Sequence, residues 1–134
     1  MSNRVVDDRG TIRYYDGDGW FHREDGPAVI HWNGTKEWYF HGERHREDGP
    51  AGIFCSTKEW YLHGKRHRED GPAIIWDKGS EEWYLHGKRH REDGPAVIWA
   101  GGAKYWYLHG EEYTEKEFEI RVKLLKSKIL SVLK

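Results

Sequence analysis

Residues 38–51 read Trp-Tyr-Phe-His-Gly-Glu-Arg-His-Arg-Glu-Asp-Gly-Pro-Ala, and most of this stretch recurs along the chain. The heptapeptide His-Arg-Glu-Asp-Gly-Pro-Ala starts at residues 22, 45, 67 and 90, and Trp-Tyr-(Phe/Leu)-His-Gly starts at residues 38, 60, 83 and 106. Such self-similarity is the signature of a repeat architecture, in which each unit buries its apolar face against its neighbours. The sequence therefore predicts a tandem array of about four units, preceded by a partial one around residues 11–21.

A one-residue deletion locates the loops of the repeat. Each block Trp precedes the next heptapeptide His by seven residues, whereas the spacing from heptapeptide Ala to the next Trp is ten, nine, ten and ten. Length varies in loops rather than in packed elements, so residues 32–36, 55–58, 77–81 and 100–104 are predicted hairpin loops. Asn33-Gly34 suits a type I′ turn. Gly42, which recurs in every unit, suits a second tight turn in the connector.

Each unit is thus predicted to be two antiparallel strands. The strands are expected at 28–32, 51–55, 73–77 and 96–100, each followed by a partner at 37–41, 59–63, 82–86 and 105–109. Side chains alternate between the faces of a strand, so one set is expected to form the buried spine. It comprises Ala28, Ile30, Ala51, Ile53, Ala73, Ile75, Ala96, Ile98, Trp38, Phe40, Trp60, Leu62, Trp83, Leu85, Trp106 and Leu108.

The end of the chain departs from the repeat. Thr114-Glu115-Lys116-Glu117 is a capping box that predicts a helix start. An apolar stripe follows at helical periodicity, and we expect it to cover the last hairpin: Phe118, Val122, Leu125, Ile129, Val132 and Leu133. The predicted fold is mainly β, an elongated antiparallel array of hairpins over residues 1–113 with one amphipathic capping helix over residues 114–134.

Composition excludes several classes of protein. The 134 residues carry a net charge of −1, without the basic excess of a general nucleic-acid binder. Cys55 is the single cysteine, so no intrachain disulfide is possible. No apolar run is long enough to span a bilayer, so we expect no membrane partner and a cytoplasmic location.

Nine histidines invite a metal-site interpretation. Pairs recur as His-x-x-x-His at 41/45, 63/67 and 86/90, a spacing that could hold zinc on a helix. Here each pair flanks a glycine turn, and its recurrence favours hydrogen bonding to backbone or to a carboxylate of a neighbouring unit. We expect no cofactor and no metal, with a metal-binding repeat protein kept as an alternative.

A hydrolase would need a general acid and base. His22, Glu24, Asp25 and their counterparts could supply them, but they occur four times, whereas an active site normally occupies one position on its scaffold. No Ser or Cys lies in a recognisable nucleophile setting. The sequence therefore predicts a protein that is not an enzyme.

With these motifs, about residues 12–113 resemble the MORN repeats (membrane occupation and recognition nexus). They are most similar to the divergent repeats with Trp-Tyr-x-His-Gly-x-x-His-Arg-Glu-Asp-Gly-Pro-Ala in predicted proteins of bacteriophages and large viruses. The closely spaced glycine series of ordinary MORN repeats is missing, which argues against membrane binding. The resemblance implies a binding scaffold, and it suggests a phage protein in the host cytoplasm that inhibits a host defence or CRISPR-Cas protein.

Protein binding is accordingly the leading functional hypothesis. Aromatic side chains and Arg on an extended surface are the usual contact types. The expected partner-binding residues are Tyr39, Tyr61, Tyr84, Tyr107, Phe54, Trp76, Trp99, Arg44, Arg66 and Arg89. Basic and aromatic residues also leave nucleic-acid binding as an alternative. Self-association through the C-terminal helix or an open sheet edge is a further expectation.

Overall fold

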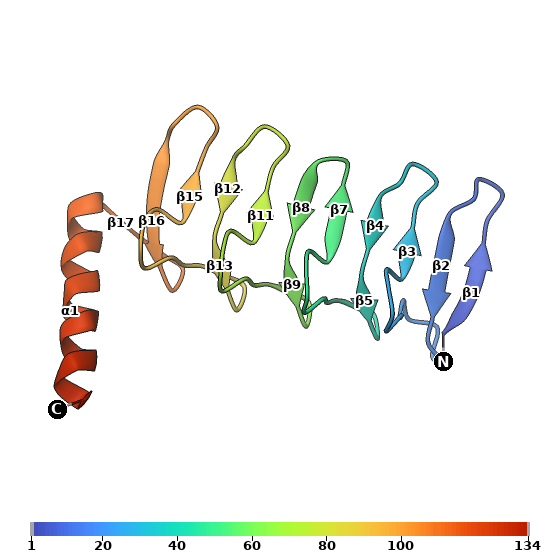
Figure 1. Ribbon diagram of the computed structural model, residues 1–134, viewed down its shortest axis with the longest axis horizontal. Coiled ribbons are helices and arrows are strands. Elements are labelled where there is room, and N and C mark those ends of the chain that lie inside the picture. The colour runs from blue at the N-terminus through green and yellow to red at the C-terminus, as the bar shows by residue number, and fades with distance from the viewer. Residues whose placement is uncertain (1, 134) are drawn as a thin grey trace.

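The computed structural model describes residues 2–133, so the outermost residues of the two predicted domains, 1 and 134, lie outside the described part. The hairpins stand side by side in one open, antiparallel, 11-stranded sheet that ends at a single helix (Figure 1). This confirms the predicted fold class. The strands of this long sheet, in spatial order, are β1 Asn3–Val6, β2 Ile12–Tyr15, β3 Val29–Ile30, β4 Lys36–Glu37, β7 Gly52–Phe54, β8 Thr57–Glu59, β11 Ile74–Ile75, β12 Glu81–Glu82, β15 Val97–Ile98, β16 Lys104–Leu108 and β17 Glu111–Tyr113.

Three of the four full units also contain a second, smaller hairpin, which the sequence analysis did not predict, whereas in the fourth unit β16 runs unbroken and pairs with β17 in the long sheet. The predicted strand 37–41 is wrong as a single element, because the chain leaves the long sheet after Glu37 and enters a two-stranded sheet at Tyr39. The same break recurs in the next two units. The small hairpins pair β5 Tyr39–Phe40 with β6 Glu43–Arg44, β9 Tyr61–Leu62 with β10 Lys65–Arg66, and β13 Tyr84–Leu85 with β14 Lys88–Arg89.

The two kinds of hairpin use different turns. In the small hairpin, His41 and Gly42 both have positive φ, 46° and 83°, which is the geometry of a type I′ turn. The type I′ turn predicted at Asn33-Gly34 is wrong. Within residues 31–35, Gly34 alone has positive φ (89°), and the His31 carbonyl accepts from the Gly34 N–H at 2.9 Å. This loop is wider than the two-residue turn at Cys55-Ser56, and the one residue that the second unit lacks makes room for it.

The array begins earlier than the repeat motifs indicate. β1 and β2 pair from Asn3↔Tyr15 to Val6↔Ile12 and form a large hairpin like the others. Its loop has the same hydrogen bonds, with the Gly10 N–H donating to the Asp7 carbonyl. Residues 3–10 therefore belong to the array, although their sequence lacks the repeated motifs.

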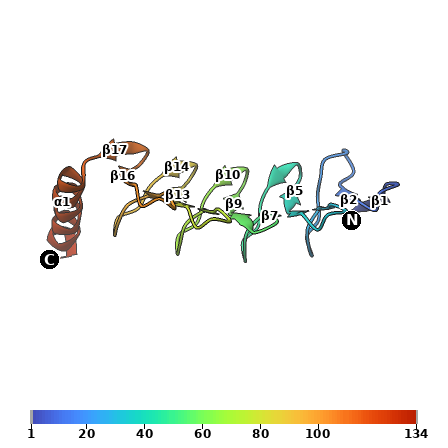
Figure 2. The same ribbon diagram turned by 90° about the horizontal axis from the view of Figure 1, so that it is seen from above.

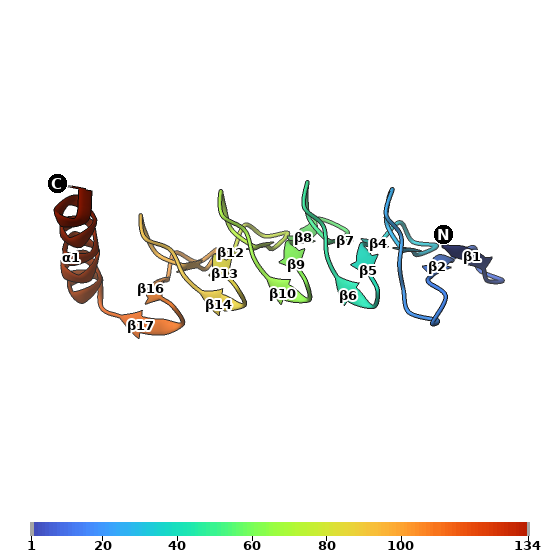
Figure 3. The same cartoon turned by 90° about the horizontal axis from the view of Figure 1, so that it is seen from below.

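Burial in the sheet corrects the predicted spine. Ala28, Ala51, Ala73 and Ala96 are fully buried as expected, but the Ile side of the first strand is only half-buried. The neighbouring position is buried instead, by Val29, Gly52, Ile74 and Val97. The small hairpins explain why these positions are buried, because they fold over the side of the long sheet that carries Val29, Gly52, Ile74 and Val97. Figure 3 shows them on one side, with the loops after β6, β10 and β14 passing to the other.

Helix α1 (Glu115–Leu133) closes the C-terminal end. The capping prediction is confirmed at Thr114, whose Oγ1 accepts from the Glu117 N–H at 3.2 Å. The predicted stripe is correct for two of its six residues: Phe118 and Val122 pack against Leu108, whereas the rest of the stripe is exposed. The helix lies across the end of the row and extends past its lower edge (Figures 1 and 2). No helix in residues 2–133 is both long and apolar enough to cross a membrane.

Candidate functional site

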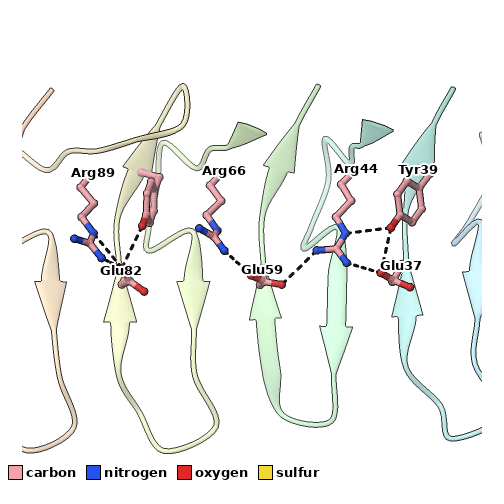
Figure 4. Close-up of polar contacts among 8 residues, drawn as sticks. Glu37, Tyr39, Arg44, Glu59, Arg66, Glu82 and Arg89 are labelled. Atoms are coloured by element: carbon pink, nitrogen blue, oxygen red, sulfur yellow. Dashed lines mark hydrogen bonds and ion pairs between the residues drawn. The ribbon is translucent and has the colours of Figure 1, made fainter. Parts of the chain in front are cut away.

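A row of buried glutamates crosses the side of the long sheet that the small hairpins cover. Each is the last residue of a strand of that sheet: Glu37 of β4, Glu59 of β8 and Glu82 of β12. The small hairpins supply arginines that reach down to them (Figure 4). We call these six residues the Glu–Arg ladder: Glu37, Glu59, Glu82, Arg44, Arg66 and Arg89.

The contacts of the ladder connect strands within and between units. Arg44 Nη2 donates to Glu37 Oε1 at 2.6 Å, and its Nη1 lies 3.7 Å from Glu59 Oε2. Arg66 reaches the other Glu59 oxygen at 3.5 Å, and Arg89 donates to Glu82 through Nε and Nη2 at 3.1 and 2.9 Å. Glu59 thus holds arginines from two successive units, which couples those units directly.

The electrostatics of the ladder favour the charged forms. Burial alone would raise the pKa of Glu37, but hydrogen bonds from His31 and Arg44 outweigh it and hold that pKa below its usual value. Burial likewise opposes the charge on Arg44, yet Tyr39 and Glu37 raise its pKa further. Glu37 and Arg44 are therefore both charged at neutral pH, and their charges offset each other inside the fold.

The sequence-predicted partner-binding residues all lie on this side of the sheet. Tyr84 is buried and donates to Glu82 at 3.2 Å, while the other three tyrosines are half-buried. Phe54 is half-buried, with the Arg44 guanidinium 5.4 Å from its ring centroid. The three arginines belong to the ladder, which leaves Trp76 and Trp99 as the most exposed residues of the predicted set, at 37% and 38%. The partner-binding role stays a prediction.

A histidine joins each unit to the next one. The Nδ1 atoms of His22, His45, His67 and His90 accept the backbone N–H of His41, His63, His86 and His109, at 2.9–3.0 Å. The two imidazoles of each pair lie together, with centroids 4.0–4.5 Å apart. Because Nδ1 accepts, the ring must be neutral with its proton on Nε2. The recurring histidines therefore form hydrogen bonds to the backbone of the neighbouring unit, as their recurrence predicted.

The remaining polar residues of the connector are used locally. Arg46 donates to Asp48 and to the Pro50 carbonyl, at 2.9 and 3.0 Å, and its guanidinium stacks 4.0 Å from the Trp38 ring centroid. The later connectors repeat the same contacts with Arg68 and Arg91. The invariant Arg, Asp and Trp thus shape the connector itself.

Within the part of the chain that the structure describes, the glutamate of each connector, unlike the Arg and Asp beside it, forms no short ion pair. Glu47 and Glu69 have side chains that are 83% exposed, and each has one oxygen 3.6 Å from the histidine Nε2 of its own connector. That distance is too long for a strong bond. Each connector therefore presents one largely unneutralised carboxylate on the surface.

The hairpin tips carry the residues that change from unit to unit. All tips lie along one long edge of the array (Figure 1). Three tryptophans there are exposed, and we call them the tip row: Trp32 at 63%, Trp76 at 37% and Trp99 at 38%. In the second unit Phe54 stands at the position of Trp76 and Trp99, and Cys55 at that of Trp32. Cys55-Ser56 form a two-residue turn in which Cys55 has a φ of 56°.

Comparisons with known proteins add no family. Family models, curated proteins and solved structures all gave no match to this chain. The MORN-like assignment accordingly remains a prediction from the motifs. Among residues 2–133, His, Cys, Asp and Glu side chains do not gather in threes that could hold a metal ion.

Sequence reasoning missed the ladder glutamates, although a signal was present. A Glu immediately precedes the block Trp at positions 37, 59 and 82, but Tyr105 takes this place in the last unit. The last unit is also where α1 follows instead of another connector. The recurrence of a charged residue at the same strand position in three units is the signal that could have identified the ladder.

Proposed function

We propose that this chain is a non-enzymatic scaffold that binds a protein partner through its tip row. One observation carries the proposal: the invariant polar residues are used in the same internal contacts in every unit, while the varying tips remain exposed. A repeated residue with a repeated structural contact needs no catalytic role to explain it. The surface free to carry specificity is then the edge with Trp32, Trp76 and Trp99.

The chemistry of the tip row fits protein recognition. Tryptophan is among the residue types that contribute most to protein interfaces, because it buries a large area with few rotatable bonds. The array holds these side chains on hairpins of one continuous sheet, so the spacing between them is fixed before binding. Arginines of the ladder are already ion-paired, which makes them poorer ligands for a nucleic-acid backbone. A host protein as the partner is a prediction that rests on the MORN-like resemblance.

The test compares affinity capture by wild type with capture by a Trp32→Ala, Trp76→Ala, Trp99→Ala variant. The control carries Val5→Thr and Val6→Thr, which changes exposed apolar residues on the edge strand β1. We expect a stoichiometric partner to be retained by wild type and control and lost from the triple variant. Equal capture by all three proteins, or no stoichiometric partner in any, would overturn the proposal.

A further inference from the structure

The second half of α1 carries apolar residues that the array leaves partly or largely exposed. Four of its exposed large apolar residues are Leu124, Leu125, Ile129 and Leu130, at 57%, 38%, 60% and 63%. We call residues 123–133 the projecting helix segment, because the helix extends past the lower edge of the array there (Figure 1). Exposed apolar side chains in such a group mark an interaction surface.

The charges on the projecting helix segment are all positive. Lys123, Lys126 and Lys128 flank its apolar residues, and residues 123–133 contain no Asp or Glu. Two such segments packed together would place lysines against lysines, which is unfavourable. The partner surface must therefore be acidic at its rim and apolar at its floor.

The connectors of the same chain form a surface of that kind. A groove of about 710 Å³ lies between the second and third connectors, and we call it the connector groove. Trp60 and Leu62 lie in it, and its walls include Glu47-Asp48 and Glu69-Asp70. A similar groove of about 590 Å³ lies one unit earlier. The unneutralised Glu47 and Glu69 carboxylates give the connector groove its negative charge.

The chain itself shows that α1 fits beside a connector. At the last unit, Phe118 and Val122 of α1 pack with Leu108 and Trp106, which are the counterparts of Leu62 and Trp60. The neighbouring connector residue Glu92 is 61% exposed, compared with 83% for Glu47 and Glu69. The N-terminal half of α1 thus already packs on the Trp–Leu pair next to an acidic connector.

We propose that the projecting helix segment of one copy docks in the connector groove of a second copy, and that this chain self-associates through that contact. Lysines of the segment then face Glu47 and Glu69, and its leucines and isoleucine cover the apolar floor. The tip row takes no part in this contact, so the self-association proposal goes beyond the proposed function. Self-association can be disproved while the protein-binding role of the tip row still stands.

The experiment measures weight-average mass by sedimentation equilibrium over a range of concentrations. Two variants reverse one side of the contact each: Lys123→Glu, Lys126→Glu, Lys128→Glu in the helix, and Glu47→Lys, Glu69→Lys in the groove. We expect wild type to associate, and each variant alone to associate at least about tenfold more weakly, because like charges then meet. Mixing the two variants brings the acidic helix to the basic groove and should restore association.

The control variant carries Lys65→Glu, Lys88→Glu and Lys116→Glu, three exposed lysines outside the segment with the same change in net charge. It should associate like wild type, and circular dichroism should show equal helix content in all variants. A monomeric wild type at every concentration would overturn the proposal. So would undiminished association of the helix variant, or a mixture that associates no better than its components.

Discussion

The connectors and the hairpin tips use their residues in opposite ways. In the connectors, His67 accepts a backbone N–H of the next unit and Arg68 stacks on Trp60 of its own unit. At the tips, Trp32 is mostly exposed and the loop varies in length and composition. The invariant segment therefore holds the array together, whereas the variable one stays exposed. The difference shows that the residues which are invariant within this repeat are those that make its structural contacts, both within a unit and between units.

The largest expected effect is at the inter-unit histidine. His67→Ala removes a buried ring and leaves the His86 N–H without its acceptor, so it should lower the free energy of unfolding by about 3 kcal/mol. Trp32→Ser at a tip should change it by no more than about 0.5 kcal/mol. Urea unfolding of both variants measures the contrast. Similar losses for the two would break the distinction between connector and tip.

The ladder should rank next. Glu59→Ala leaves Arg44 and Arg66 without their shared carboxylate, and the expected loss is about 2 kcal/mol because both arginines keep some contact with water. Lys58→Ala changes the exposed neighbouring residue of the same strand and should cost about 0.5 kcal/mol or less. The same unfolding assay applies. A Glu59 variant as stable as the Lys58 variant would show that the ladder contributes little.

A smaller effect tests packing on the covered side of the sheet. Gly52 stands where other units have Val or Ile, and a Cβ there would lie 2.6 Å from Phe54 Cε2. Gly52→Val should therefore cost about 1–2 kcal/mol. Adding Phe54→His recreates the Val29 and His31 pair of the first unit and should recover most of the loss. If the second change brings no recovery, the Phe54 ring is not the cause.

The smallest effect concerns pH. Burial, with the neighbouring His109, holds the pKa of His90 below its ordinary value of 6.5. The unfolded chain takes up protons first as the pH falls. The stabilisation is therefore complete above pH 6.5 and is lost as the pH falls through the folded-state pKa. His90→Asn keeps an acceptor but cannot titrate, so its unfolding midpoint should depend less on pH than that of wild type. Identical pH profiles would contradict this.

The repeat period, the fold class, the tip loops and the helix start could be predicted from sequence, because each depends on local spacing or composition. The side of the long sheet that the small hairpins cover could not be predicted. Side-chain alternation holds within one sheet, but the chain changes sheets at Trp38, so the faces assigned to Tyr39 and Phe40 do not follow from Glu37. The tight turn at Gly42 was predicted, but its type was not, because a non-glycine residue with positive φ, such as His41, is uncommon.

The sequence also overstated how much the array covers α1. A continuous apolar stripe predicts one continuous contact, but the last unit is shorter than the helix. Phe118 and Val122 therefore find partners, while Ile129 does not. Sequence periodicity reports which side chains share a face of a helix, whereas the length of the neighbouring surface decides how many of them are buried.

The central claim is that the invariant histidines are neutral acceptors joining successive units. A ¹⁵N NMR experiment at neutral pH tests it by detecting scalar coupling across the hydrogen bond from the His86 amide nitrogen to His67 Nδ1. We predict that coupling, with the His67 proton on Nε2, and equivalent couplings at the other three junctions. A proton on His67 Nδ1, with no coupling and rapid exchange of the His86 amide, would contradict the account.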